Sequence, residues 1–242
     1  NLAAIPRTLA VYGTEASPAD AIALRAGPVT ALFEPSTGFL RYISYGGKEI
    51  VRGIYAAVRD HVWGTVAPRI ANVVVEDRGT SFKLTFDVDC RQGDIDFFWQ
   101  GVITGSVDGR VRFEMNGKAR STFRKNRLGF AILHPIKGCA GQPCQIEKTD
   151  GATEQGTFPA AISPHQPFLN LRAITHTVEP GLTAEVRMEG DTFEMEDHRN
   201  WTDGNYKTYC TPLALPFPVE VKVGSEIKQS VTITLKGNAV AR

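Results

Sequence analysis

The sequence predicts an all-β protein, a large antiparallel β-sandwich with at most short helices. Three observations support this fold class. Apolar and polar residues alternate with a period of two along most of the chain. Glycines and prolines divide this alternation into short runs, and no 3.6-residue periodicity is sustained over three turns. Of 242 residues, 42% are hydrophobic and 22% are charged, which is enough apolar surface for a single domain over residues 1–242.

The N-terminal part predicts a series of β-hairpins. Its β-prone runs lie at residues 21–24, 29–33, 39–45 and 49–54, separated by glycine and proline. Gly46 and Gly47 fit a two-residue hairpin loop, because glycine reaches the positive φ angles that such tight turns need.

Helical candidates are few. Residues 56–61 and 17–21 are expected to form short helices, and no longer stretch of the chain favours one.

The middle of the chain continues the alternation. Further strands are predicted at residues 70–75, 81–89, 95–104 and 110–116, the last after a turn at Asp108-Gly109. Within residues 81–89, one set of alternate side chains is apolar and the other is polar, which indicates one wall of a core with a solvated outer side. The apolar set is Phe82, Leu84, Phe86 and Val88.

Two irregular stretches, residues 137–144 and 156–168, predict ordered loops. Three prolines in the second stretch forbid a central strand, and ordered loops on a β scaffold commonly carry binding groups. The four cysteines are too few for a disulfide framework in a chain of this length, which favours a reducing compartment. The spacing of Cys139 and Cys144 does not fit a zinc knuckle. We therefore expect neither a metal nor a cofactor.

The charge balance argues against nucleic-acid and membrane partners. Lys and Arg total 27 and Asp and Glu total 26, for a net charge of +1, so no general field would gather polyanions. No apolar run approaches the ~20 residues that span a bilayer, and the first seven residues lack a signal-peptide layout. A soluble, cytoplasmic protein is expected. The chain lacks an initiator methionine and stops after a strand-like run at 231–235, so a C-terminal companion domain is also expected.

The segment at residues 193–203 concentrates charge more than any other part of the chain. Strand alternation places Glu194, Glu196 and His198 on one side and Asp197 on the other, where it is expected to be structural. On a flat, exposed face Glu196 would merely pair with Arg199 or Lys207 and contribute under about 1 kcal/mol.

On the floor of a concave sheet the same carboxylates would repel each other, so one would have a raised pKa and could act as an acid or base. Trp201 favours this second interpretation, because an aromatic ring beside carboxylates and an arginine suits a sugar. The alternative for Trp201 is an ordinary core position.

Two histidines are further candidates. His134 ends an apolar strand, where it either hydrogen-bonds a nearby backbone group or stands at the rim of a cleft as a general acid or base. His165 lies between Pro164 and Pro167, which fix the backbone around it as either a binding group or a well-packed loop requires. The sequence contains no phosphate-binding glycine loop, no Gly-x-Ser-x-Gly elbow and no His-Glu-x-x-His motif.

Three motifs carry a resemblance to a known family: NRLGFAILHP at 126–135, FPAAISPHQPF at 158–168, and FEMEDHRNWTD at 193–203 with its continuation to residue 213. Together they resemble the N-terminal β-sandwich region of the D-apionate lactonase family. The resemblance implies a longer enzyme in which a barrel-like domain follows.

More distantly, the chain is similar to the galactose mutarotase-like supersandwich, where a histidine acid and a glutamate base open a sugar ring. The second resemblance would put His134 or His165 and Glu194 or Glu196 in those roles.

The favoured hypothesis is an enzyme domain that hydrolyses or binds a sugar-acid lactone. Glu196 or Glu194 would be the general base on water, and His134 or His165 would protonate the leaving oxygen. Arg199, Lys207 or Arg127 would hold the oxyanion or the product carboxylate. The expected substrate-binding set is Arg127, His198, Arg199, Trp201 and Lys207. The alternatives are a non-catalytic carbohydrate-binding or docking sandwich, a mutarotase-type epimerase, and a salt-bridged surface patch without a ligand.

Overall fold

The computed structural model describes residues 20–237. These residues form antiparallel strands and one short 3-10 helix, so the predicted all-β antiparallel sandwich is confirmed. The strands are β1 (Ile22–Ala26), β2 (Val29–Glu34), β3 (Phe39–Tyr45), β4 (Lys48–Asp60), β5 (Pro68–Asp77), β6 (Phe82–Gln92), β7 (Ile95–Gly105), β8 (Val111–Ala119), β9 (Phe123–Pro135), β10 (Pro143–Lys148), β11 (Thr153–Thr157), β12 (Phe168–Glu179), β13 (Leu182–Glu189), β14 (Phe193–Asp197), β15 (Asn205–Tyr209), β16 (Val219–Val221) and β17 (Glu226–Gly237), with helix η1 (His198–Trp201) between β14 and β15.

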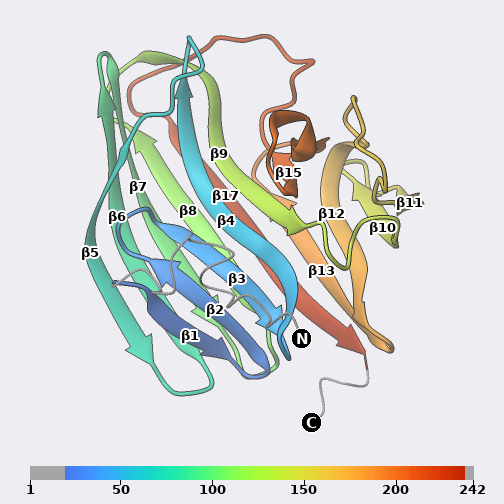
Figure 1. The fold of residues 1–242 in the computed structure, drawn as a ribbon. Coiled ribbons are helices and arrows are strands. Elements are labelled where there is room, and N and C mark those ends of the chain that lie inside the picture. The colour runs from blue at the N-terminus through green and yellow to red at the C-terminus, as the bar shows by residue number, and fades with distance from the viewer. Residues whose placement is uncertain (1–19, 238–242) are drawn as a thin grey trace.

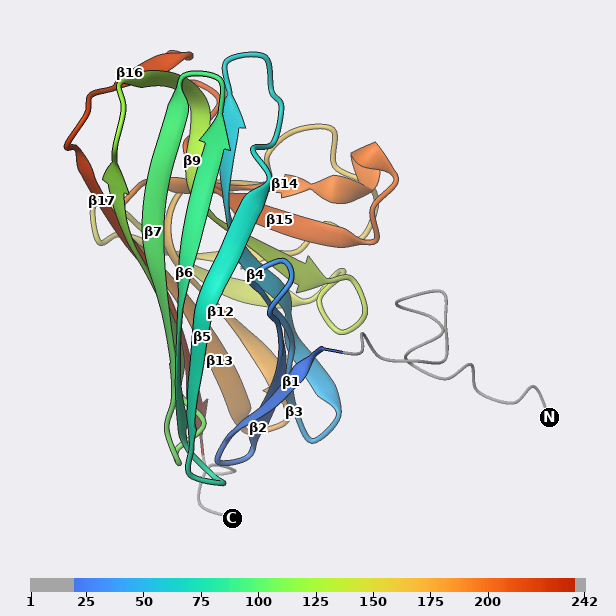
Figure 2. The same ribbon diagram turned by 90° about the vertical axis from the view of Figure 1, so that its left-hand side faces the viewer.

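The strands form two layers that are joined through β12. One layer has the order β1, β2, β3, β4, β9, β15, β14, and the other has the order β5, β6, β7, β8, β17, β13. β12 pairs with β13 in the second layer and with β14 in the first, and it also carries β10 and β11. Figure 1 shows β4 and β9 lying across β8 and β17. In Figure 2, β14, β15 and η1 lie on the side away from β7 and β17.

The core fills the space between the layers with interdigitating aromatic rings. Phe33 of β2 lies 4.9 Å from Phe86 of β6, and Phe130 of β9 lies 4.9 Å from Phe113 of β8, measured between ring centroids. Each pair joins one layer to the other. Gly101 lies beside Phe86, and a Cβ there would come within 2.3 Å of the Phe86 ring, so only glycine lets this ring pack.

The local predictions are largely confirmed, with one error. Gly46 and Gly47 form the β3–β4 turn with φ of 52° and 79°. The helix predicted at 56–61 is wrong, because β4 continues to Asp60 and its residues 53–60 pair with β9. The helix expected at 17–21 falls mostly outside the described residues. The described part of the chain has no helix with the length and apolar character that a bilayer crossing needs.

Candidate functional site

Four neighbouring strands of the first layer align polar side chains on one face. In the β4–β9–β15 register, Tyr55 is opposite Ala131, which is opposite Tyr209. Tyr209 in turn is opposite Glu194 of β14, and Lys207 is opposite Glu196. Residues directly opposite each other in antiparallel strands project to the same face. These strands therefore present two tyrosines, a lysine and two glutamates on a shared surface.

The middle of this surface has small residues, so a depression forms between the longer side chains. Ala57, Gly129 and Ala131 make the floor of a cleft of about 60 Å³. Its walls are longer polar and aromatic side chains: Tyr55, Arg59, Arg127, Lys207 and Tyr209. We call it the β4–β9–β15 cleft. The cleft lies on the outer face of the first layer, opposite to the aromatic core. On β9, Leu128, Phe130 and Ile132 alternate with the floor residues and are buried between the layers.

Arg127 is held by aromatic rings rather than by a carboxylate. Its guanidinium carbon lies 4.0 Å from the Tyr209 ring centroid and 5.0 Å from that of Trp63. Its Nε is buried and has no partner among the described residues. Arg59 donates from Nε to the Trp63 carbonyl at 2.9 Å, which ties the β4–β5 loop to the same arginine pair. Cation–π contacts fix the position of an arginine while leaving its hydrogen-bond donors free for a ligand.

Lys207 lies among these cations with no hydrogen bond or ion pair to any described residue. Burial lowers the pKa of its ammonium, Arg127 and Arg59 lower it further, and Glu196 and Asp203 oppose this shift. Burial raises the pKa of Tyr55, which is also influenced by Arg59, Glu196, Asp203 and Arg127. The same charged groups thus act on both residues, so the cleft is a single electrostatic environment with an excess of positive charge.

Glu196 has an imidazole close by. Its Oε1 lies 3.9 Å from His198 Nε2, and His198 Nδ1 lies 3.0 Å from Asp203 Oδ2. Burial and the neighbouring Lys207 lower the pKa of His198, against the opposing effects of Asp203 and Glu196. Glu196, His198 and Asp203 thus form an acidic–imidazole group at the Lys207 end of the cleft, and a carboxylate beside an imidazole can transfer protons.

Glu194 shares the face but has a different environment. It is buried, accepts a hydrogen bond from the Tyr209 hydroxyl, and accepts another from Leu213 N–H at 3.3 Å. Burial and Glu194 both raise the pKa of Tyr209, while a hydrogen bond from Gln166 lowers it. In this position Glu194 orients Tyr209, and through it the ring that Arg127 stacks on.

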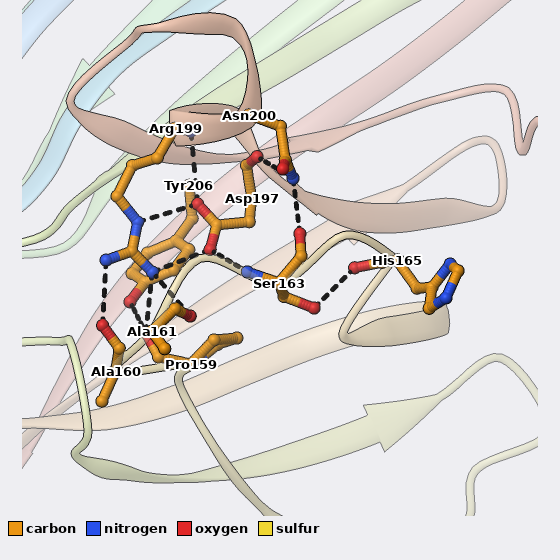
Figure 3. A network of polar contacts seen from close by, with 9 residues as sticks. All are labelled: Pro159, Ala160, Ala161, Ser163, His165, Asp197, Arg199, Asn200 and Tyr206. Carbon is orange, nitrogen blue, oxygen red and sulfur yellow. Dashed lines mark hydrogen bonds and ion pairs between the residues drawn. The ribbon is translucent and has the colours of Figure 1, made fainter.

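Asp197 is structural, as the alternation predicts, and Arg199 joins it. The Asp197 carboxylate accepts from Arg199 Nε at 2.9 Å, from a terminal Arg199 nitrogen at 2.7 Å and from Ser163 N–H at 2.9 Å. The remaining Arg199 donors bind the carbonyl oxygens of Pro159, Ala160 and Ala161. Figure 3 shows this Asp197–Arg199 cluster joining η1 to the 159–163 loop. Each side-chain nitrogen of Arg199 has a protein partner, so this predicted substrate-binding residue holds the 159–163 loop and lies apart from the β4–β9–β15 cleft.

His134 does not lie at the rim of a cleft. It is completely buried on the core side of β9, its Nε2 lies 2.8 Å from Thr208 Oγ1, and Phe158 and His176 are close to it. Burial, with a contribution from His176, lowers its pKa to about 3. The placement follows from alternation: His134 shares its face with Phe130 and Ile132, so it packs inward, away from Glu196.

His165 and Trp201 also lie apart from the cleft's floor. His165 is exposed, and in Figure 3 its ring points away from the Asp197–Arg199 cluster while its carbonyl accepts from Ser163 Oγ. Trp201 is 69% exposed on η1, so it is not the core tryptophan that was the alternative interpretation. Of the predicted residues, the structure therefore brings together Glu196, Glu194, Arg127, His198 and Lys207.

Sequence reasoning missed Tyr55, Arg59, Trp63, Tyr209 and Asp203. Arg59 lies in the segment 56–61 that was expected to be helical, and Tyr55 directly precedes it; β alternation would have placed Tyr55, Ala57 and Arg59 on one face. The described residues include no group of three or more histidine, cysteine or acidic side chains that could hold a metal ion, and all four cysteines are buried and free.

Comparisons with known proteins agree with this fold. Residues 9–238 match the family model "D-apionate lactonase, N-terminal domain". A D-apionate lactonase from Brucella anthropi is 41% identical over 226 residues, which are 93% of this chain and 37% of that protein. The chain therefore spans little more than a third of this relative's length.

Among solved structures, a galactose 1-epimerase from Lactobacillus acidophilus matches with a TM-score of 0.61 at 6% identity, over 90% of this chain and 94% of that one. An aldose epimerase homologue from C. elegans matches with a TM-score of 0.53 at 10% identity, over 90% and 99% of the two chains. At these identities the structural likeness shows the fold alone, which is the galactose mutarotase-like supersandwich.

Proposed function

The chain belongs to the family of D-apionate lactonase N-terminal domains, and from this premise we propose that its β4–β9–β15 cleft binds a sugar-acid lactone for hydrolysis. The observation that supports this most directly is the composition of the cleft. Three cations, Arg59, Arg127 and Lys207, surround a floor of alanine and glycine, and none of the three is paired with a carboxylate in the described chain. A cationic cleft of about 60 Å³ suits the lactone carbonyl group, which becomes a carboxylate on hydrolysis, with the rest of the sugar outside the cleft.

In the proposed reaction Glu196 takes a proton from water as the water oxygen attacks the lactone carbonyl carbon. The carbonyl oxygen becomes an oxyanion, and Lys207 and Arg127 stabilise its charge. When this tetrahedral intermediate collapses, the carbonyl re-forms, the bond to the ring oxygen breaks, and that oxygen receives a proton. Glu196 passes the proton that it took from water to the neutral His198 imidazole, whose Nε2 lies 3.9 Å from Glu196 Oε1, and the resulting imidazolium protonates the ring oxygen. His198 takes the role for which His134 and His165 were candidates, while Glu194 orients Tyr209.

The experiment is hydrolysis of the lactone of D-apionate, followed by acid release at constant pH, in a longer family member with this domain and in this chain alone. Glu196→Gln removes the base while keeping the size of the side chain, and it should reduce turnover at least about 100-fold. Glu189→Gln, an exposed glutamate at the end of β13, is the matched control. Unchanged turnover in Glu196→Gln would remove Glu196 from the reaction.

A second candidate function is a non-catalytic sugar-binding domain whose companion supplies the chemistry. It is favoured by one observation: the chain covers 37% of the length of the lactonase relative. Calorimetry with the D-apionate anion on this chain, in parallel with the hydrolysis assay, separates the two. Binding without turnover in this chain supports the second candidate. Accelerated exchange between the anomers of an aldose, measured by NMR, would instead support a mutarotase-type epimerase.

A further inference from the structure

A second cleft lies beside the first and shares Arg127 with it. It has a volume of about 370 Å³ and runs between the beginning of β9 and the segment at residues 211–217. Arg127 lines both clefts, and Trp63 lines the second, so the arginine and its aromatic support separate the two spaces. Nothing in the proposed reaction uses this second space.

Two adjacent polar groups in the wall of this cleft have no partner. Asn126 is 6% exposed, and both its amide nitrogen and its amide oxygen are buried without a hydrogen bond in the described chain. The neighbouring Arg127 Nε is in the same state. Buried polar groups in folded proteins nearly always have partners, and exceptions call for an explanation such as a bound ligand. An amide N–H and a guanidinium fork together match an anionic carboxylate.

The charges around the cleft favour an anion. Lys125 and Arg127 line it, and the acidic residue among its lining groups is Asp191. The Asp191 carboxylate is already engaged: Oδ1 accepts from Thr192 N–H at 2.7 Å, and Oδ2 accepts from the Thr211 hydroxyl at 3.2 Å. Asp191 thus already has two hydrogen-bond donors, whereas Lys125 and Arg127 have no carboxylate partner in the described chain.

The remaining walls are apolar. Leu213, Leu215 and Phe217 line the cleft and are exposed, and the Phe217 ring makes an edge contact with Trp63 at 5.1 Å between centroids. An apolar ligand body that packs against this exposed aromatic and aliphatic wall would bury apolar surface and so gain binding free energy. The cleft therefore joins a polar, cationic side to an apolar one.

We propose that this cleft is a second binding site, for a small carboxylate with an apolar or aromatic body. The carboxylate would be bound by Asn126 and Arg127, and the body would lie against Leu215 and Phe217. Since Arg127 also lines the β4–β9–β15 cleft, such a ligand would draw the guanidinium away from the first site and act as an inhibitor there. Binding in this cleft goes beyond the proposed function and does not depend on it, whereas the inhibition rests on the proposed function.

The test is calorimetry of this chain with benzoate, benzamide and acetate as probes. Benzoate carries both the charge and the apolar body, benzamide lacks the charge, and acetate lacks the body. We expect benzoate to bind at least about tenfold more tightly than either, because each missing part removes one set of contacts. Equal affinities for benzoate and benzamide, or no binding of benzoate, would overturn the proposal.

Variants identify the site. Asn126→Ala should weaken benzoate binding about tenfold without lowering the thermal midpoint, because the amide makes no intramolecular hydrogen bond that folding would lose. Phe217→Ser should weaken it similarly, and Leu169→Ser, at an exposed leucine of β12, should leave it unchanged. Unchanged benzoate affinity in both Asn126→Ala and Phe217→Ser would overturn the assignment. Because Glu196→Gln tests the other cleft, loss of lactone hydrolysis and loss of benzoate binding can be told apart.

Discussion

Two buried histidines should make the stability of this protein unusually dependent on pH between 7 and 5. His134 and His176 both contact the Phe158 ring, and burial lowers the pKa of His134 to about 3 and that of His176 to about 4, from 6.5. Neither Nδ1 has a partner in the described chain. Both imidazoles are therefore neutral in the folded protein throughout this pH range.

The sign follows from proton linkage. Between pH 6.5 and the folded pKa values the unfolded chain binds more protons than the folded one, so lowering the pH favours unfolding. The stability is fully present above about pH 6.5 and is lost progressively as the pH falls toward the folded values. Each site costs about 1.4 kcal/mol per pH unit when fully linked, so from pH 7 to pH 5 the two together remove about 4 kcal/mol. His198, whose pKa is also lowered, adds a smaller part because it is less buried.

The assay is urea unfolding at pH 7 and pH 5, with tryptophan fluorescence as the probe. His134→Gln keeps a hydrogen-bonding atom near Thr208, and His176→Gln removes the second imidazole. Each should remove about half of the pH-dependent loss, whatever it does to stability at pH 7. His165→Gln, in the exposed loop, is the control and should keep the full loss. If the double variant still lost about 4 kcal/mol on acidification, the linkage argument would be refuted.

Two further predictions concern the charged segment and the cleft. Arg199→Ala should reduce the free energy of unfolding by about 3 kcal/mol, since it leaves the buried Asp197 carboxylate without its cation. Trp201→Ala, at an exposed ring, is the control and should change this free energy by less than about 0.5 kcal/mol. Comparable losses for the two variants in urea unfolding would contradict this assignment. Binding of the D-apionate anion, measured by calorimetry, should weaken as the pH rises through the lowered pKa of Lys207, because the ammonium then loses its charge. Lys207→Arg should abolish that weakening, and an identical pH profile in the variant would exclude Lys207 from the site.

Period-two alternation was sufficient to predict the faces of the charged segment. It separated Glu194 and Glu196 from Asp197, and the structure places the first two on the face of Lys207 and the third against the 159–163 loop. The same rule put His134 with Phe130 and Ile132, which argues for a core position more strongly than for a cleft. In β structure the side of the sheet is a local property that sequence reveals.

What the sequence could not show depends on long-range pairing. Residues 56–61 contain Ala56 and Ala57, whose intrinsic preference is helical, yet pairing with β9 makes them part of a strand and turns Ala57 into the floor of a cleft. Arg199 lies next to Glu196 and His198 in sequence, but its donors bind carbonyl groups some 40 residues away. Neither arrangement can be predicted from neighbouring residues in the sequence, because each depends on which distant segment packs beside it.

The position of β9 has a consequence for how the site comes into existence. β9 carries Arg127 and pairs with both β4 and β15, so Tyr55, Arg127 and Lys207 become neighbours only after these two distant segments have paired with this one strand. Closing such long loops is entropically costly and slow. During synthesis, a nascent chain that has not yet reached β14 lacks both Glu196 and Lys207, and one that ends before β15 still lacks Lys207, so ligand recognition arises late.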